Sequence, residues 1–196
     1  LIMSENSIGQ TPPFEMTYCP SISKVQGTIT LTKYHELITT GFVRPQIEAI
    51  RQAAAQGDKE RCAALKRSLP AVIVGAVFEG QRKKEGFRRG LCQLVLDVDK
   101  LDAPQLADLT TCLRKDPIVH YFNISPSGNG VKIFISYTTE SGEIPTDWAT
   151  YEALHHTAYD YVVDAFRQCY DYDIDTTGRD PMRICFLSYD PDAYYN

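Results

Sequence analysis

The segment Leu94–Asp99 places two aspartates at the end of an apolar run, in the order Leu-Val-Leu-Asp-Val-Asp. Alternate side chains of an extended strand point to the same face, so Asp97 and Asp99 share a face at the end of a central, covered strand. Carboxylates this close repel unless a cation lies between them or a proton neutralises one of them. The segment therefore predicts a Mg²⁺ or Mn²⁺ site. The alternative, that both aspartates merely end the strand at a turn, stays open.

Hydrophobic periodicity and helix-ending residues divide the rest of the chain. Residues 1–27 are polar and proline-containing, which predicts an irregular arm with short strands near 14–18 and 27–31; residues 28–196 are expected to form one domain. This order of elements favours an α+β fold, a mixed sheet with helices packed on it and a helical N-terminal portion. The expected helices are 44–55, 58–69, one between Asp102 and Pro117, and 148–170, and the expected strands are 71–78, 94–99, 119–124, 131–137 and 184–187.

Residues 125–132 form a turn rich in serine and glycine between two predicted strands. Its glycines permit a positive φ and a close approach of the backbone to a ligand, so amide groups can face an anion. Two serine hydroxyls and one lysine add donors, which predicts a phosphate cradle, although the spacing is not that of a Walker A loop. The alternative is a hairpin turn with an exposed lysine. The candidate phosphate-binding residues are Ser125, Ser127, Gly128, Gly130 and Lys132.

A third group of charged residues follows the long predicted helix. Asp173 and Asp175 share a face if the chain is extended there, and Arg179 and Arg183 follow closely. Arginine binds phosphate in a bidentate manner, so both arginines are candidate phosphate ligands. A surface cluster of salt bridges is the alternative.

The loop 81–90 is strongly basic. Its cationic side chains are candidate contacts for the phosphates of a nucleic-acid template, while a merely solvated charged loop is the alternative. The candidates that we single out are Arg82, Lys83, Lys84 and Arg88.

Three of these groups, the strand ending in Asp97 and Asp99, the 125–132 turn and the acidic and basic segment 173–183, follow one another along the chain. In this order they resemble the motifs of the archaeo-eukaryotic primase superfamily, which includes the primase-polymerases. Leu94–Asp99 is similar to its first motif, and residues 127–132 are similar to its Ser-Gly-x-Gly motif, with lysine in the usual place of histidine. Asp175, with Asp173 in reserve, is similar to its third acid. Over residues 60–196 the pattern looks most like the VirE-associated N-terminal domain of helicase proteins from mobile elements of Bacteroidetes.

This resemblance implies an RRM-type sheet and a primase- or polymerase-like nucleotidyltransferase acting in replication of a mobile element. Asp97, Asp99 and Asp175 would be catalytic and would hold two Mg²⁺ or Mn²⁺ ions, while the serine and glycine turn, with Arg179 and Arg183, would bind the nucleotide. The implied partners are nucleoside triphosphates, a single-stranded DNA template and a helicase domain in the same or a partner chain.

A second functional class stays open, a catalytically weak or inactive module of the same fold that binds nucleotide or nucleic acid for a helicase. Lys132 brings a fixed charge where histidine can stay neutral, and the net charge of −5 gives no general attraction for nucleic acid; both features favour this class. Retention of all three acids favours the enzyme. The adjacent pair His155-His156 lies in a predicted helix, so its side chains diverge and a nuclease-type metal site is disfavoured.

The cysteine content and the apolar runs of the sequence indicate where in the cell the protein is expected. The six cysteines form no C-x-x-C pair, which favours reduced thiols and a cytoplasmic protein. Apolar runs fall short of the roughly 20 residues of a membrane helix, and the first residues do not resemble a signal peptide. We therefore expect no membrane partner.

Overall fold

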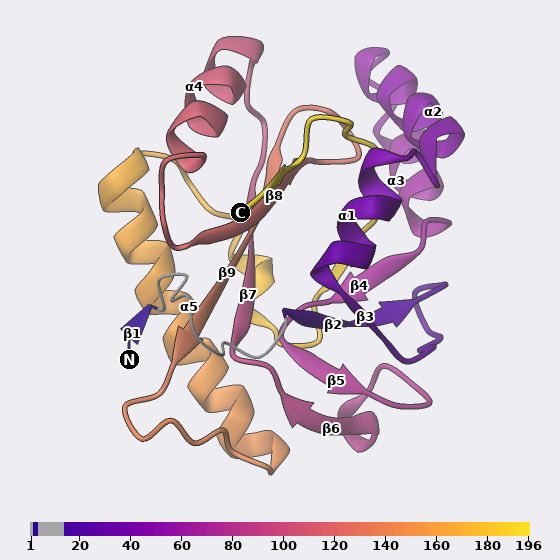
Figure 1. Cartoon of the computed structure of the whole chain (residues 1–196). Coiled ribbons are helices and arrows are strands. Elements are labelled where there is room, and N and C mark those ends of the chain that lie inside the picture. The colour runs from indigo at the N-terminus through magenta and orange to yellow at the C-terminus, as the bar shows by residue number, and fades with distance from the viewer. Residues whose placement is uncertain (1, 4–13) are drawn as a thin grey trace.

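The computed structural model of this chain describes residues 2, 3 and 14–196. Its architecture is α+β, as expected, with helices α1–α3 on one side of the main sheet and α4 and α5 on the other (Figure 1). The α-helices are α1 Leu31–Thr39, α2 Arg44–Ala55, α3 Lys59–Arg67, α4 Ala103–Leu113 and α5 Trp148–Tyr170, with short 3-10 helices η1 Lys84–Gly86 and η2 Thr176–Arg179.

The main sheet is antiparallel and is built around β9. This strand pairs with β7 on one side and β8 on the other, while β8 also pairs with β11 and the far end of β9 pairs with β1. The strands are β1 Ile2–Met3, β7 Gln93–Val98, β8 Val119–Ile124, β9 Val131–Thr138 and β11 Tyr194–Tyr195. The hairpin expected around residues 125–130 is therefore confirmed as β8–β9.

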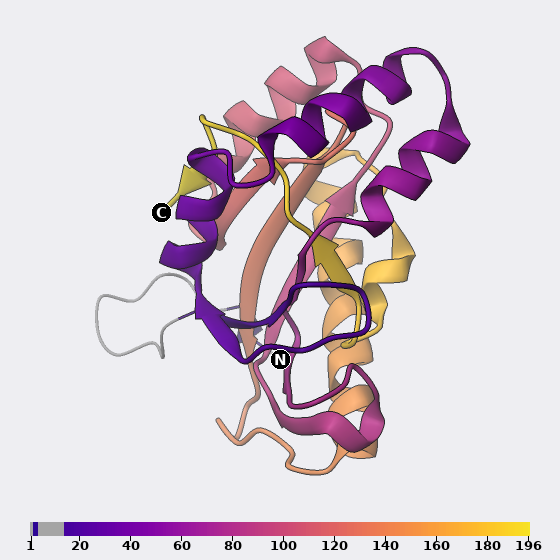
Figure 2. The ribbon, with the colours of Figure 1, turned by 90° about the vertical axis from the view of Figure 1, so that its right-hand side faces the viewer.

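Both faces of this sheet are covered. Leu94 and Leu96 of β7 belong to the core formed with α4 and α5, whereas Val95 between them belongs to a second core formed with α1 and α2. This alternation follows from the two-residue period of a strand. Asp97 follows the parity of Val95 and so lies on the face of the sheet that α1 and α2 cover. In Figure 2 these helices are turned toward the viewer.

The expected central position of the Leu94–Asp99 strand is wrong in one respect. Among the described residues β9 is the only strand that pairs with β7. The open edge of β7 is instead covered by the segment at η2, since the Asp175 N–H donates to the Asp97 carbonyl at 2.8 Å and Val95 lies against Gly178. All six residues of β7 are buried, so an apolar run alone cannot distinguish a paired edge from an edge covered by a loop.

A second antiparallel sheet has the order β10-β4-β2-β3, built from β2 Glu15–Cys19, β3 Thr28–Thr30, β4 Ala71–Ile73 and β10 Ile184–Phe186. The short strands expected near 14–18 and 27–31 are thus present, and β2 lies inside this sheet with Met16 and Cys19 buried. The part of the predicted arm that comprises residues 1 and 4–13 lies outside the described residues.

The single strand expected over 71–78 is interrupted. β4 ends at Ile73, and β5 Ala76–Phe78 pairs instead with β6 Phe87–Gly90. The break contains Gly75, where a Cβ atom would lie 2.7 Å from the His155 ring of α5 and whose carbonyl accepts a hydrogen bond from Tyr151. Close packing of α5 on Gly75 therefore turns the chain from one sheet to the next.

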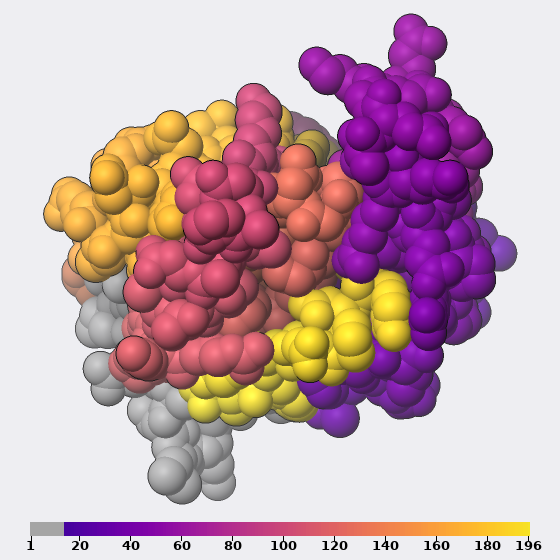
Figure 3. All heavy atoms as spheres, turned by 90° about the horizontal axis from the view of Figure 1, so that it is seen from above, coloured from indigo at the N-terminus to yellow at the C-terminus, as the bar shows by residue number. Residues whose placement is uncertain are grey.

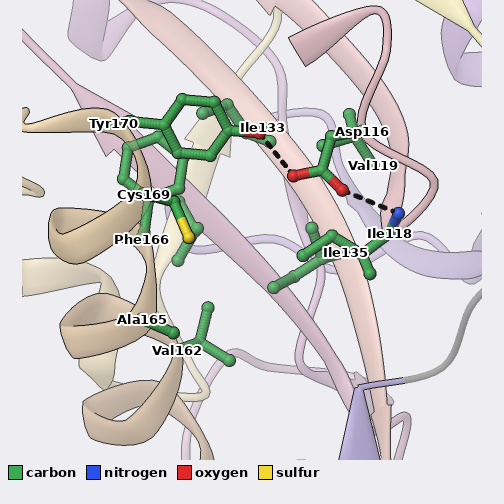
Figure 4. A pocket seen from close by; sticks show the side chains of 11 residues that line it. Asp116, Ile118, Val119, Ile133, Ile135, Val162, Ala165, Phe166, Cys169 and Tyr170 are labelled. Atoms are coloured by element: carbon green, nitrogen blue, oxygen red, sulfur yellow. Dashed lines mark hydrogen bonds between the residues drawn. The ribbon is translucent and has the colours of Figure 1, made fainter. Parts of the chain in front are cut away.

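A small cavity of about 40 Å³ lies between the main sheet and α5. Ile133, Ile135, Val162, Ala165 and Phe166 wall it, and Figure 4 shows Asp116 at one end, where it accepts hydrogen bonds from the Ile118 amide and the Tyr170 hydroxyl. Its walls are almost entirely apolar.

Within residues 2–3 and 14–196, no helix has both the length and the apolar character needed to cross a bilayer.

Candidate functional site

A row of polar side chains crosses an otherwise apolar face of the main sheet. Asp97 of β7, Lys132 of β9 and Asn123 of β8 are direct cross-strand neighbours. All three are buried, and Asn123 accepts a hydrogen bond from the Tyr34 hydroxyl of α1 at 3.2 Å. Cross-strand neighbours on one face have Cβ atoms about 5 Å apart, so the register of the sheet brings these groups together.

Lys132 and Asp97 form a buried ion pair. The distance from Lys132 Nζ to Asp97 Oδ1 is 2.6 Å, and the two residues are 9% and 7% exposed. Burial alone lowers the pKa of Lys132, but the Asp97 carboxylate and other neighbours outweigh burial, so the pKa is raised above its ordinary value. Lys132 therefore stays charged and is bound to an acid, which corrects the alternative of an exposed hairpin lysine.

Asp99 lies against the turn that joins β8 to β9. A Cβ atom on Gly130 would lie 2.8 Å from Asp99 Oδ1 and 2.5 Å from the Val98 carbonyl oxygen, so only glycine fits. The Leu101 amide also donates to the Asn129 carbonyl at 2.9 Å. The turn and the end of β7 are thus one structural unit, as the sequence predicted for the cradle and the first acids.

The electrostatic environment of Asp99 is mixed. Its pKa is raised, first by burial and then by repulsion from Asp97, while Lys132 and Lys66 act in the opposite direction. Repulsion from Asp175 contributes further to the rise. A raised carboxyl pKa in a cluster of charged groups is typical of functional sites, although structural ion pairs also produce it.

The serine and glycine turn is approached by two cations that sequence reasoning missed. Lys66, at the end of α3, places its Nζ 3.4 Å from Ser127 Oγ, and the Arg51 side chain of α2 passes 3.4 Å from the Cβ position of Gly128. Ser127 also hydrogen-bonds Ser125, which is buried. Gly128 has a φ of 84°, as expected for its place in the turn.

Arg51 is incompletely paired. One guanidinium nitrogen, Nη2, donates to the Tyr189 carbonyl at 2.8 Å, while its buried Nε has no hydrogen-bond partner among the described residues. Burial lowers its pKa. Ile47 and Ile50 mark the buried face of this helix, and Arg51 lies four residues after Ile47. That spacing on a helix face is the signal that could have identified Arg51.

Asp175, rather than Asp173, is the acid next to Asp97. The Asp175 amide donates to the Asp97 carbonyl at 2.8 Å, whereas the Asp173 side chain is 94% exposed and faces Arg167. Burial raises the pKa of Asp175. Hydrogen bonds from Thr177, and after them the charge of Arg183, lower it by more, so the pKa lies below its ordinary value. The assignment of the third acid to Asp175 thus agrees with its position beside the first.

The two candidate arginines differ in position. Arg183 lies 3.8 Å from Asp175 Oδ2, and its buried Nε has no partner among the described residues. Arg179 instead forms a bidentate pair with Asp160 of α5, at 2.8 Å for both contacts, and this pair is exposed. The surface salt-bridge alternative therefore describes Arg179, and Arg183 is the arginine at the site.

The predicted basic loop lies at the opposite end of β7 from Asp97, at the bottom of Figure 1 near β5 and β6. Arg82 donates to two backbone carbonyls, of Ile22 and Met182, and so holds loops together. Lys84 pairs with Glu152 and Arg88 with Glu79, while Lys83 is exposed. The structure does not bring these four residues to the acids.

The metal site implied by the resemblance does not fit this arrangement. Asp97 is held by Lys132, and both carboxylate oxygens of Asp175 accept hydrogen bonds from Thr177. Within residues 14–196, no three His, Cys, Asp or Glu side chains form a group that could hold a metal ion. Asp97 and Asp175 instead form ion pairs with cations of the chain itself, Lys132 and Arg183.

Comparison with protein families gives one clear finding. Residues 64–195 match the family described as BT4734-like, N-terminal domain, a span that contains the three acids and the turn but not Arg51. Neither the curated proteins nor the solved structures yield a match. Because the matched span covers more than half of the 196 residues, the chain belongs to the BT4734-like N-terminal domain family.

Proposed function

We propose that this chain is a nucleotide-binding domain of the primase-polymerase type that serves nucleic-acid synthesis on a mobile element. One observation carries the proposal: three segments far apart in the sequence meet at one end of the main sheet. These are the Asp97–Asp99 strand end, the 125–132 turn and the segment from Asp175 to Arg183, joined by the contacts of Asp97 with Lys132 and Asp175. The same three segments carry the resemblance to the primase superfamily.

The chemistry of the turn supports a phosphate ligand. Ser127 and Gly128 are flanked by Lys66 and Arg51, so hydroxyl groups, a close backbone and two cations face one small region. Among the described residues the Arg51 Nε donates to no acceptor, and a buried unsatisfied donor is costly. A phosphate oxygen would supply the missing acceptor and opposite charge.

Metal-dependent nucleotidyl transfer is the second candidate. Its support is the backbone hydrogen bond between Asp175 and Asp97, which places the third acid of the expected Mg²⁺ or Mn²⁺ set beside the first. That activity requires Lys132 to release Asp97, since the pair occupies the carboxylate. The ion pair therefore favours the binding module over the enzyme. Both candidate functions include the same partners, a single-stranded DNA template and a helicase domain, and both place the protein in the cytoplasm.

Fluorescent nucleotide titration tests the binding proposal. We expect the wild-type chain to bind a fluorescent ATP analogue, and Lys66→Gln to weaken binding by roughly tenfold or more, because a charge-assisted contact contributes about 1.5–3 kcal/mol. Lys83→Gln, an exposed lysine at the other end of the molecule, is the matched control and should leave affinity unchanged. Equal affinities in wild type and Lys66→Gln would contradict the site.

Primer synthesis separates the two candidates. Wild type is incubated with single-stranded DNA, labelled nucleotides and Mg²⁺ or Mn²⁺. Incorporation that disappears in Asp99→Asn, with nucleotide binding retained, would support the enzyme. Nucleotide binding without incorporation would support the module.

A further inference from the structure

Helix α3 has an unusual balance of charge and burial. Its nine residues contain four basic side chains and one acidic side chain, in a chain whose net charge is −5. None of the nine residues is buried. Cys62 and Leu65 are partly buried against the second core, and most of the remaining surface of α3, which carries the basic side chains, faces solvent.

The basic residues of α3 gather toward one face that adjoins the site. Lys59, Lys66 and Arg67 are spaced at i, i+7 and i+8, which places them on neighbouring positions of the helix surface. Lys66 contacts Ser127 of the turn. Figure 3 shows the molecule from the end where this turn lies, with the turn between α4 and the helices α2 and α3.

Three basic side chains of α3 form no ion pair with an acidic side chain of the described residues. Among residues 14–196, no acidic side chain lies within ion-pair distance of Lys59, Lys66 or Arg67. In the basic loop, by contrast, Lys84 and Arg88 each pair with a glutamate. Among residues 14–196, α3 therefore contributes positive charge beside the site that is not held in an ion pair.

We propose that the face of α3 formed by Lys59, Lys66 and Arg67 binds the phosphates of a single-stranded nucleic acid that leads into the site. The proposal rests on the nucleotide-binding function above and places the template contact on α3 instead of the 81–90 loop. Lys59 and Lys66 lie seven residues apart, about 10.5 Å along the helix axis, and Lys66 lies beside Ser127 of the turn. Cations at both ends of this face can contact separate phosphates of one strand that leads into the turn.

Fluorescence anisotropy with a labelled oligo-dT strand tests this surface in the whole chain. The variant is Lys59→Glu with Arg67→Glu, and the matched control is Lys83→Glu with Lys84→Glu, which changes the net charge equally. We expect the α3 variant to lose at least about tenfold in affinity at low salt and its log-log salt slope to fall by roughly 1.4, two contacts at about 0.7 each. The control should keep the affinity within about twofold and keep the slope.

Circular dichroism and binding of the fluorescent ATP analogue are measured on the same variants. Because α3 buries none of its residues, the fold and nucleotide binding should survive; if the fold does not, Lys59→Gln with Arg67→Gln replaces the charge reversals. Equal losses in both reversal variants, or no DNA binding by wild type, would overturn the proposal. Displacement of the oligonucleotide by poly-glutamate as readily as by unlabelled DNA would also overturn it, in favour of an acidic protein partner.

Failure of this inference is distinguishable from failure of the proposed function. Loss of DNA binding with ATP-analogue binding intact concerns α3 alone. Absence of ATP-analogue binding in wild type contradicts the nucleotide site itself.

Discussion

Replacing Lys132 by methionine should destabilise the fold strongly, because it leaves the Asp97 carboxylate buried without its partner. At 2.6 Å the direct attraction is roughly 6 kcal/mol for an effective dielectric constant of about 20. Desolvation of both groups offsets most of that energy, yet removing one partner of a buried pair costs about 3–5 kcal/mol. For a chain of this size, that loss corresponds to a decrease in melting temperature of roughly 6–20 °C.

Urea unfolding of a double-mutant cycle measures the interaction. Lys132→Met and Asp97→Leu should each destabilise, while the double variant should recover to within about 1–2 kcal/mol of wild type, because an apolar pair can replace a buried ion pair. The sequence alone suggests that Asp97→Asn with Asp99→Asn leaves the fold intact through relief of repulsion. The structure reverses this expectation, since Asp97→Asn leaves Lys132 charged and unpaired in the interior.

The pH dependence follows from the raised pKa of Lys132. The stabilisation is fully present below the ordinary lysine value of 10.5 and is lost as the pH rises toward the higher folded value. Lys132→Met should remove this alkaline dependence. A loss of less than about 1 kcal/mol in Lys132→Met at neutral pH would refute the reasoning, because it would mean that water or another group compensates the carboxylate.

Three further predictions concern stability. Gly130→Ala should lower the free energy of unfolding in urea by about 1–3 kcal/mol, because its Cβ atom would overlap the Val98 carbonyl and the Asp99 carboxylate; an unchanged midpoint would contradict this close packing. Ala165→Val should raise the melting temperature slightly, since filling about 40 Å³ recovers up to roughly 1 kcal/mol; a clear decrease would mean that the cavity cannot accept two methyl groups. Burial lowers the pKa of His155 to about 3. As the pH falls below about 6.5, this imidazole therefore becomes protonated in the unfolded chain but stays neutral in the folded chain. Stability should therefore fall as the pH drops below 6.5, by on the order of 2 kcal/mol at pH 4.5, and a flat profile would contradict a neutral buried imidazole.

Local sequence was sufficient for most elements. The expected helices 44–55 and 148–170 coincide with α2 and α5, because their apolar spacing and flanking residues carry the signal. The hairpin followed from a serine and glycine turn between two apolar runs. The resemblance associated the 125–132 turn with Asp97 and Asp99, but their contact depends on the pairing of β9 with β7, which local sequence did not predict.

The partners of the site residues were decided only by the tertiary structure. Asp175 and Asp173 are alike in sequence, and only the packing of η2 against β7 places Asp175 beside Asp97. The sequence indicated no role for Arg51 or Lys66, and they reach the turn because α2 and α3 pack beside it.

The sequence by itself determined that the acids lie at the end of an apolar strand, because the order of residues 94–99 is a local property. It could not determine that Lys132 would neutralise Asp97, because that contact depends on the register between β7 and β9, 35 residues apart along the chain. Register is set by the packing of both faces of the sheet against helices. The sequence thus identified the charged residues of the site. Which of them form ion pairs with one another was determined by the tertiary structure.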